Sequence, residues 1–236
     1  MAKNYWAILI TYILMQLSGF VGIPLMNGLG VNNPIVMWSV VSFLGALIII
    51  LFLIKATPNE PFMRSDRMPV DRAILWSIIG VFLAYAAQIA AGIIETELLG
   101  IKPGSENTQA LVEYAKAAPI FIVVTSVFGP ILEEIVFRKV IFGSLYKRFN
   151  FWISALLSSL IFGAIHMELV HLLMYFSMGL VFAFLYVKTK RLIVPIIAHV
   201  TMNTIVVLIN VFLGDKIMEM QKQLEQLESF IGGFWL

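Results

Sequence analysis

Two adjacent carboxylates and a guanidinium lie inside an apolar run of this chain, in the segment EEIVFR at residues 133–138. Ionisable side chains in a segment apolar enough to cross a membrane are costly, and they usually serve a function. Successive residues of an α-helix point about 100° apart, whereas residues four apart share a face. We therefore expect Glu134 to pair with Arg138, which leaves Glu133 free for chemistry.

Three further polar side chains occur in two later apolar runs: His166 in FGAIH (162–166), and His199 and Asn203 in HVTMN (199–203). His199 and Asn203 are four residues apart, so they can present donors to the same point. An acid, two histidines and an amide inside separate membrane spans are hard to explain by packing alone, so we expect them to form one site. His171 is interpreted as an interhelical or interfacial residue outside this site.

The elements that must position these residues are membrane helices. The 236 residues are 60% hydrophobic and 13% charged, with a mean hydropathy of +0.93, whereas soluble domains are roughly 45 to 50% apolar. This composition predicts an all-α, polytopic transmembrane helix bundle of about seven spans, with six or eight as the alternatives. The expected spans are Trp6–Leu25, a run from the turn at Asn27–Pro34 to about Ile54, Ala73–Ile94, Ala117–Tyr146 with a kink at Gly129-Pro130, Phe151–Met167, His171–Val187 and Leu192–Leu213.

The spans divide the chain into three parts. Residues 1–116 are predicted to hold N-terminal transmembrane helices and linkers, and residues 117–213 the catalytic helix core. Residues 214–236 form an amphipathic tail, in which apolar residues recur at 3,4 spacing: Ile217, Met220, Leu224, Leu227 and Ile231. We expect this tail to pack on the rest of the protein; the alternatives are a membrane-interface helix, or contact with a partner or a second copy.

Charges predict the orientation in the membrane. With this set of spans, 11 of the 16 Lys and Arg residues fall in segments on one side, four fall on the other, and Arg138 lies within the membrane. The positive-inside rule then places the N-terminus in the cytoplasm and Glu95–Lys116 in an outer loop. At about 1.5 Å of rise per residue, Glu133 and His166 lie roughly 22 and 24 Å from the inner ends of their spans, and His199 and Asn203 roughly 12 and 18 Å. These depths allow one site within the bilayer.

Composition also excludes several classes. The chain has no cysteine, which removes thiolate metal sites and cysteine nucleophiles. The net charge is +2, and the basic residues fall in short clusters between apolar runs, which is typical of topology signals rather than of nucleic-acid binding.

The segments EEIVFR, FGAIH and HVTMN resemble, in this order, the EExxxR, FxxxH and HxxxN motifs of the CAAX protease and bacteriocin-processing enzyme family. The resemblance covers roughly Ala117 to Leu213. It implies an intramembrane endopeptidase in which Glu133 and His166 activate water, His199 and Asn203 bind the oxyanion, and Glu134 with Arg138 supports the site. Helical geometry singles out the same glutamate, Glu133, independently.

Several alternatives stay open. No cofactor is favoured, but zinc could be held by His166, His199 and Glu133, although the chain has no HExxH motif. A transporter or a non-catalytic membrane scaffold would also account for buried ionisable residues. The expected partners are the lipid bilayer and a small membrane-associated or precursor peptide. The compact chain without a targeting extension is typical of a bacterial, multi-pass cell-membrane protein.

Overall fold

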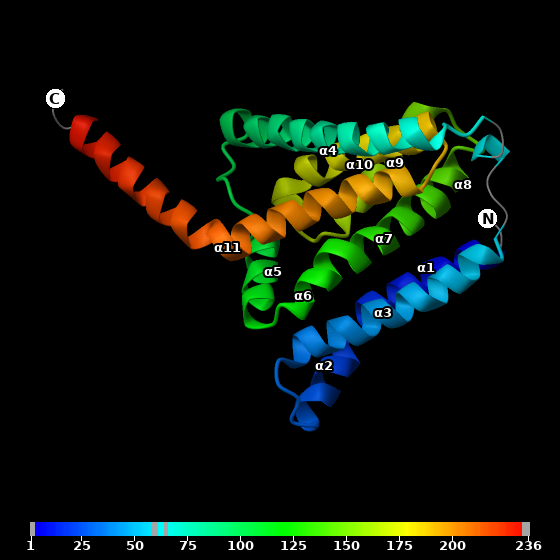
Figure 1. The fold of residues 1–236 in the computed structure, drawn as a ribbon, viewed down its shortest axis with the longest axis horizontal. Helices are drawn as coiled ribbons and strands as arrows, with labels where there is room; N and C mark the ends of the chain where they lie inside the picture. Colours follow the sequence, from blue (N-terminus) through cyan, green and yellow to red (C-terminus); the bar gives the residue numbers. More distant parts are fainter. Residues whose placement is uncertain (1–2, 58–60, 64–65, 233–236) are drawn as a thin grey trace.

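The computed structural model describes residues 3–57, 61–63 and 66–232, and in these residues it contains helices and no strand. The predicted all-α bundle is confirmed (Figure 1). In chain order the elements are α1 (Lys3–Leu17), α2 (Gly19–Gly28), α3 (Pro34–Lys55), η1 (Pro61–Met63), α4 (Val70–Ile93), η2 (Ile94–Leu98), α5 (Glu106–Ala117), α6 (Ile120–Val123), η3 (Val124–Phe128), α7 (Gly129–Glu133), η4 (Glu134–Phe142), α8 (Gly143–Leu145), α9 (Phe151–Ala164), η5 (Leu169–His171), α10 (Leu172–Thr189) and α11 (Ile193–Gly232).

Helix lengths differ from the seven full spans expected. Among the described residues, five helical stretches are long and apolar enough to cross a membrane: Pro34–Lys55, Val70–Leu98, Ile120–Leu145, Leu169–Thr189 and Ile193–Leu224. A sixth is obtained only if α1 and α2 together form one bent span. Helix α9 is apolar but has 14 residues, which rise about 21 Å and fall short of a hydrocarbon core of roughly 30 Å.

The first expected span is broken at Ser18, where α1 and α2 meet at 43°. The Ser18 hydroxyl donates to the carbonyl of Met15 (2.7 Å) and accepts from the indole N–H of Trp38 (3.0 Å). Side-chain bonds back to the helix carbonyls bend helices. The segment predicted to be the first span therefore consists of two helices joined at a bend.

The span that carries the glutamates runs through Pro130 without ending, as predicted. In place of a simple kink, π-helical turns lie on both sides of α7, in η3 and η4. Proline lacks an N–H and crowds the carbonyl four residues earlier, and the wider π-turns can accommodate both effects. Of the five long stretches, this one is the most buried, which places Glu133 and Glu134 in the middle of the bundle.

Helices α9 and α10, which precede and follow the segment that carries His166, pack closely against each other. A Cβ added at Gly179 of α10 would lie 2.7 Å from the Ser159 Cβ of α9. Small residues let membrane helices approach each other closely. The position of His166 therefore depends on this contact between two glycine- and serine-bearing helix faces.

The predicted outer loop contains a helix that sequence reasoning missed. Ser105 caps α5, because its hydroxyl accepts from the backbone N–H of Thr108 (3.0 Å). Leu111, Tyr114 and Ala115 then pack in a cluster with residues of other helices. The spacing of these apolar residues after a serine N-cap was the available signal.

The amphipathic tail is continuous with α11 and extends beyond the other helices (Figure 1). Ile217, Met220, Leu224 and Leu227 are 41 to 61% exposed, so the interpretation that this face packs on the rest of the chain is wrong for these residues. The side chain of Ile231 lies outside the described residues.

Candidate active site

A cavity of about 390 Å³ lies within the helix bundle, and the four residues predicted to be catalytic line its wall. Glu133 ends α7, His166 follows α9, and His199 and Asn203 share a face of α11. The structure therefore brings all four together from three separate parts of the chain. Their roles stay predictions.

Glu134 connects two other predicted site residues. Its Oε2 lies 3.1 Å from Arg138 Nε, which confirms the predicted pairing of residues four apart. Its Oε1 lies 2.9 Å from Nδ1 of His199, a contact that the sequence analysis did not foresee. A carboxylate accepts from the N–H on Nδ1, so the tautomer and ring orientation of His199 are fixed, and Nε2 is left for the cavity.

The Arg138 side chain is fully buried. Its guanidinium carbon lies 4.6 Å from the centre of the Phe162 ring and 5.3 Å from that of Phe182. Within the described part of the chain, its N–H groups have no aligned hydrogen-bond acceptor, so Arg138 is held by the charge of Glu134 and by the aromatic faces. Phe182 also stacks on His199, with ring centres 4.6 Å apart.

Glu133 is the more accessible of the two glutamates, with 18% of its side chain exposed. Its Oε2 lies 3.7 Å from Nε2 of His199. This separation is longer than a hydrogen bond, so the two atoms are not hydrogen-bonded to each other. Helical geometry predicted that Glu133 and Glu134 would point in different directions, and the two carboxylates do have different partners.

His166 lies beyond the end of α9, in a turn followed by Met167 with a positive φ of 56°. Its Nδ1 is 2.8 Å from the carbonyl oxygen of Phe162. Because a carbonyl can only accept, Nδ1 carries the proton and Nε2 keeps the lone pair. The ring stacks on Tyr175, with centres 4.1 Å apart.

Asn203 makes one long contact. Its Nδ2 lies 3.5 Å from the carbonyl oxygen of Thr125, at the limit for a hydrogen bond. The amide has a second N–H, and Asn203 lines the same cavity as His199. Both residues therefore face one cavity, as their spacing predicted.

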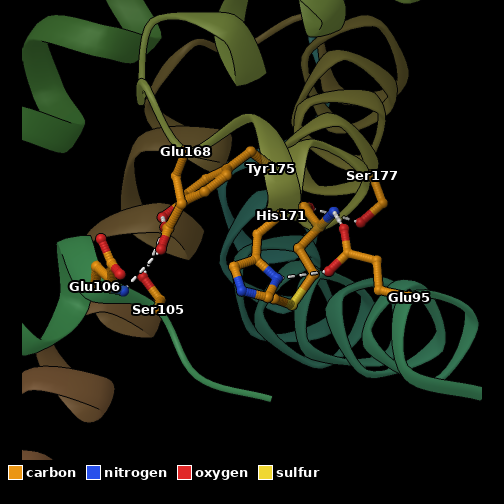
Figure 2. A network of polar contacts seen from close by, with 8 residues as sticks. Glu95, Ser105, Glu106, Glu168, His171, Tyr175 and Ser177 are labelled. Atoms are coloured by element: carbon orange, nitrogen blue, oxygen red, sulfur yellow. Dashed lines mark hydrogen bonds and ion pairs between the residues drawn. The ribbon is translucent and has the colours of Figure 1, made fainter. Parts of the chain in front are cut away.

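The loop that carries His166 is anchored by two carboxylates that the sequence analysis did not assign (Figure 2). Glu168 accepts from the Ser105 hydroxyl (2.8 Å), the Glu106 backbone N–H (2.7 Å) and the Tyr175 hydroxyl (2.8 Å). These bonds connect the loop to the N-terminal end of α5 and to α10.

The second carboxylate is Glu95, whose Oε2 lies 2.9 Å from Nδ1 of His171 and whose Oε1 accepts from the Met174 backbone N–H (3.2 Å). His171 is thus an interhelical hydrogen-bonding residue, as predicted. Glu95 was wrongly placed in the outer loop, because η2 continues α4 and buries it to 1% exposure. Its spacing from α4 could have suggested a helical continuation, but no local signal pointed to His171.

The ionisation of Glu168 is set by these contacts. Partial burial alone would raise the pKa of Glu168, but hydrogen bonds from Ser105, Tyr175 and the backbone N–H groups of Glu106 and Asn107 outweigh it. Bonds donated to a carboxylate stabilise its charged form. The pKa of Glu168 therefore lies below its ordinary value, and the group is ionised near neutral pH.

Helices α1, α3 and α4 also contribute to the cavity. Gln16 of α1, Ser39 of α3 and Gln88 of α4 line it, although the motifs all lie after residue 117. These side chains carry donors and acceptors without charge. They were missed because no spacing rule relates a single amide or hydroxyl to a site formed by distant helices.

Among the described residues, the side chains considered as zinc ligands do not form a complete ligand set. No three His, Asp or Glu side chains in the part of the chain that the structure describes are arranged so that they could hold one ion. Of the three side chains considered as zinc ligands, Glu133 and His199 approach each other, with Oε2 of Glu133 3.7 Å from Nε2 of His199. His166 does not complete a three-ligand set with them, so no chemical step is derived through a metal.

Comparisons with known proteins show the family to which the chain belongs. The profile of the family described as Type II CAAX prenyl endopeptidase Rce1-like matches residues 115–205. Over 246 aligned residues, covering 100% of both chains, the protein is 43% identical to "Putative membrane peptidase YdiL" of Bacillus subtilis (strain 168). It is 36% identical to "Membrane-embedded CAAX protease MroQ" of Staphylococcus aureus (strain USA300) over 222 residues, covering 86% of this chain and 88% of the relative. No solved structure matches the chain.

These likenesses define a membrane peptidase. The chain belongs to the CAAX protease and bacteriocin-processing enzyme family, as its three motifs predicted. It is therefore a peptide-bond hydrolase located in a membrane.

Proposed function

We propose that this protein is an intramembrane endopeptidase that cleaves a small membrane-associated or precursor peptide by water attack, with Glu133 as the base. The observation that carries the proposal is that Glu133, His166, His199 and Asn203 line one cavity within the helix bundle. A carboxylate, an imidazole lone pair and two groups of donors then face the same space.

In the first step, Glu133 takes a proton from water while the water oxygen bonds to the substrate carbonyl carbon. His166 is suited to orient that water, because its Nδ1 proton is engaged by the Phe162 carbonyl and Nε2 can accept the second water hydrogen. The carbonyl π-bond breaks, and its electron pair becomes the oxyanion.

His199 and Asn203 are proposed to bind that oxyanion. Since Nδ1 of His199 donates to Glu134, Nε2 can donate only if the ring is an imidazolium. With Glu133 and Glu134 ionised and Arg138 charged, an imidazolium at His199 makes the buried cluster neutral. After Glu133 takes the proton, the oxyanion restores the balance, so the net charge of the site does not change in a low-dielectric environment.

In the second step, Glu133 returns the proton to the amide nitrogen, the oxyanion re-forms the carbonyl, and the carbon–nitrogen bond breaks. The products are a carboxyl terminus and an amine. Glu134 and Arg138 take no part in these proton transfers; they orient His199 and supply the charge balance.

Comparison of peptides from cells that carry the wild type and the Glu133→Gln variant tests this proposal. Mass spectrometry of membranes and medium should reveal a precursor that accumulates in the variant, together with loss of its product. Equal levels of every precursor and product, with both proteins present in the membrane at equal amounts, would contradict it.

A further inference from the structure

The two histidines of the cavity are held in parallel ways. Each ring has an acceptor at Nδ1 and an aromatic ring on one face. For His199 these are Glu134 at 2.9 Å and Phe182, with ring centres 4.6 Å apart and planes at 23°. For His166 they are the Phe162 carbonyl at 2.8 Å and Tyr175, with ring centres 4.1 Å apart and planes at 23°.

His166 depends on such contacts more than His199 does. His199 lies inside α11, where the helix backbone fixes the direction of its side chain. His166 lies in a turn after α9 and is followed by Met167 in a left-handed conformation. Without a helical backbone at this point, the direction of the imidazole is set by what packs against it.

We propose that Tyr175 is a positioning residue that holds the His166 imidazole by stacking, and that Glu168 fixes Tyr175 from the N-terminal end of α5. The Tyr175 hydroxyl donates to Glu168 Oε2 (2.8 Å) and accepts from the Asn107 amide (3.4 Å). A tyrosine whose hydroxyl is hydrogen-bonded on two sides has little freedom to rotate its ring, so the ring face that stacks on His166 is fixed.

Glu168 is itself fixed on three sides. In addition to Tyr175 it binds the Ser105 hydroxyl and the Glu106 backbone N–H (Figure 2). A negative charge is favourable at the N-terminal end of a helix such as α5. One carboxylate therefore joins α5, which lines the cavity through Asn107 and Thr108, to the tyrosine that orients His166.

The inference about Tyr175 rests on the proposed function only in assuming that His166 takes part in cleavage. The position of the His166 ring can also be measured by NMR, which does not require cleavage. The chain has three histidines, so the ring signals of protein labelled at histidine can be assigned in NMR spectra from single His→Gln variants. An aromatic ring stacked on an imidazole shifts the imidazole proton signals upfield. The intact, detergent-solubilised protein is the sample.

Three variants separate stacking from general loss of structure. Tyr175→Leu removes the ring, and Tyr175→Phe keeps the ring without the hydroxyl. Tyr114→Leu is the matched control, because Tyr114 packs edge-on against Phe121 rather than on a histidine. Melting temperature and elution as a single species establish that each variant is folded.

Tyr175→Leu is expected to move the His166 ring signals downfield, whereas Tyr175→Phe keeps them near the wild-type position and Tyr114→Leu leaves them unchanged. On a peptide whose cleavage requires Glu133, Tyr175→Leu should lower kcat by about tenfold with KM changed less than about twofold, and Tyr175→Phe should recover most of the rate.

Unchanged His166 signals in Tyr175→Leu, an equal shift in Tyr114→Leu, or a downfield shift with no fall in kcat would each overturn the inference. Retained cleavage by Glu133→Gln would instead overturn the proposed function, and it would leave the NMR result standing.

Discussion

His199 lies between the two adjacent glutamates, with Nδ1 2.9 Å from Glu134 and Nε2 3.7 Å from Glu133. The two carboxylates are consecutive in sequence, yet they approach opposite nitrogens of one imidazole. Glu134 is fully buried and is also paired with Arg138, whereas Glu133 is partly accessible from the cavity. This division gives the two glutamates different expected responses to substitution.

Glu134→Gln is expected to destabilise the protein, because it leaves the buried charge of Arg138 without its counter-charge. Removing one partner of a buried pair costs about 3 to 5 kcal/mol. Melting temperature in detergent should therefore fall clearly, and activity should fall with it. The double variant Glu134→Gln, Arg138→Met should regain part of the stability but none of the activity, since His199 still lacks its carboxylate. A Glu134→Gln protein as stable as wild type would contradict this role.

Gly179→Ala is expected to destabilise the contact between α9 and α10. The new Cβ would lie 2.7 Å from Ser159 Cβ and 3.0 Å from Ser159 Cα, so backbone must move, and overpacking of this kind costs about 1 to 3 kcal/mol. Gly45→Ala is the matched control, because nothing lies within 4 Å of a Cβ added there. Thermal unfolding of the two variants should differ; equal melting temperatures would show that the helices do not meet as described.

The link between Glu168 and α5 should be insensitive to pH across the neutral range. Because hydrogen bonds hold the folded-state pKa of Glu168 below its ordinary value, the link is fully present above the unfolded pKa of about 4.3 and is lost as pH falls through the lower folded pKa. Spin labels on cysteines introduced at Ala110 and Met167 can report the distance across it, since the chain has no native cysteine.

We expect one narrow distance distribution between about pH 5 and about pH 8, and a broader one at neutral pH in Glu168→Gln. A wild-type distribution that broadens already near pH 6 would show that Glu168 does not hold α5 in the way proposed.

Cleavage is expected to withstand chelation, because the three side chains considered as zinc ligands are not arranged to hold one ion. Incubation of the purified protein with a strong chelator, followed by an activity assay, is the measurement. Loss of activity that returns on addition of zinc, but not of magnesium, would favour the metal mechanism over the glutamate base.

The sequence was sufficient to predict the helical class, the family and four of the polar residues that meet in the cavity. Long apolar runs in the sequence predict membrane helices. The four-residue spacing of Glu134 with Arg138, and of His199 with Asn203, is a local property of one helix. The contact of Glu134 with His199 was not predictable, because it joins residues 65 apart. It is set by how the continuous stretch of α7 and η4 packs on α11.

The differences between the predicted and the observed helices also arise from contacts between residues that are far apart in the sequence. The break at Ser18 depends on Trp38, which lies 20 residues later. Glu95 can be buried because its carboxylate is hydrogen-bonded to His171, 76 residues away. The charge of Glu95 alone suggested an exposed loop. The tail of α11 has the apolar spacing that was predicted, but spacing alone does not reveal which surface, if any, covers it.

If Glu133 is the base, cleavage by the reconstituted protein requires its carboxylate. Wild type, Glu133→Gln and Glu97→Gln would be placed in liposomes with the precursor peptide that accumulates in cells carrying the Glu133 variant. Glu97 is an exposed glutamate outside the cavity, and it serves as the matched control. We expect product from wild type and Glu97→Gln, and loss of cleavage by at least about a hundredfold in a folded Glu133→Gln protein. Cleavage by Glu133→Gln at the wild-type rate would contradict it.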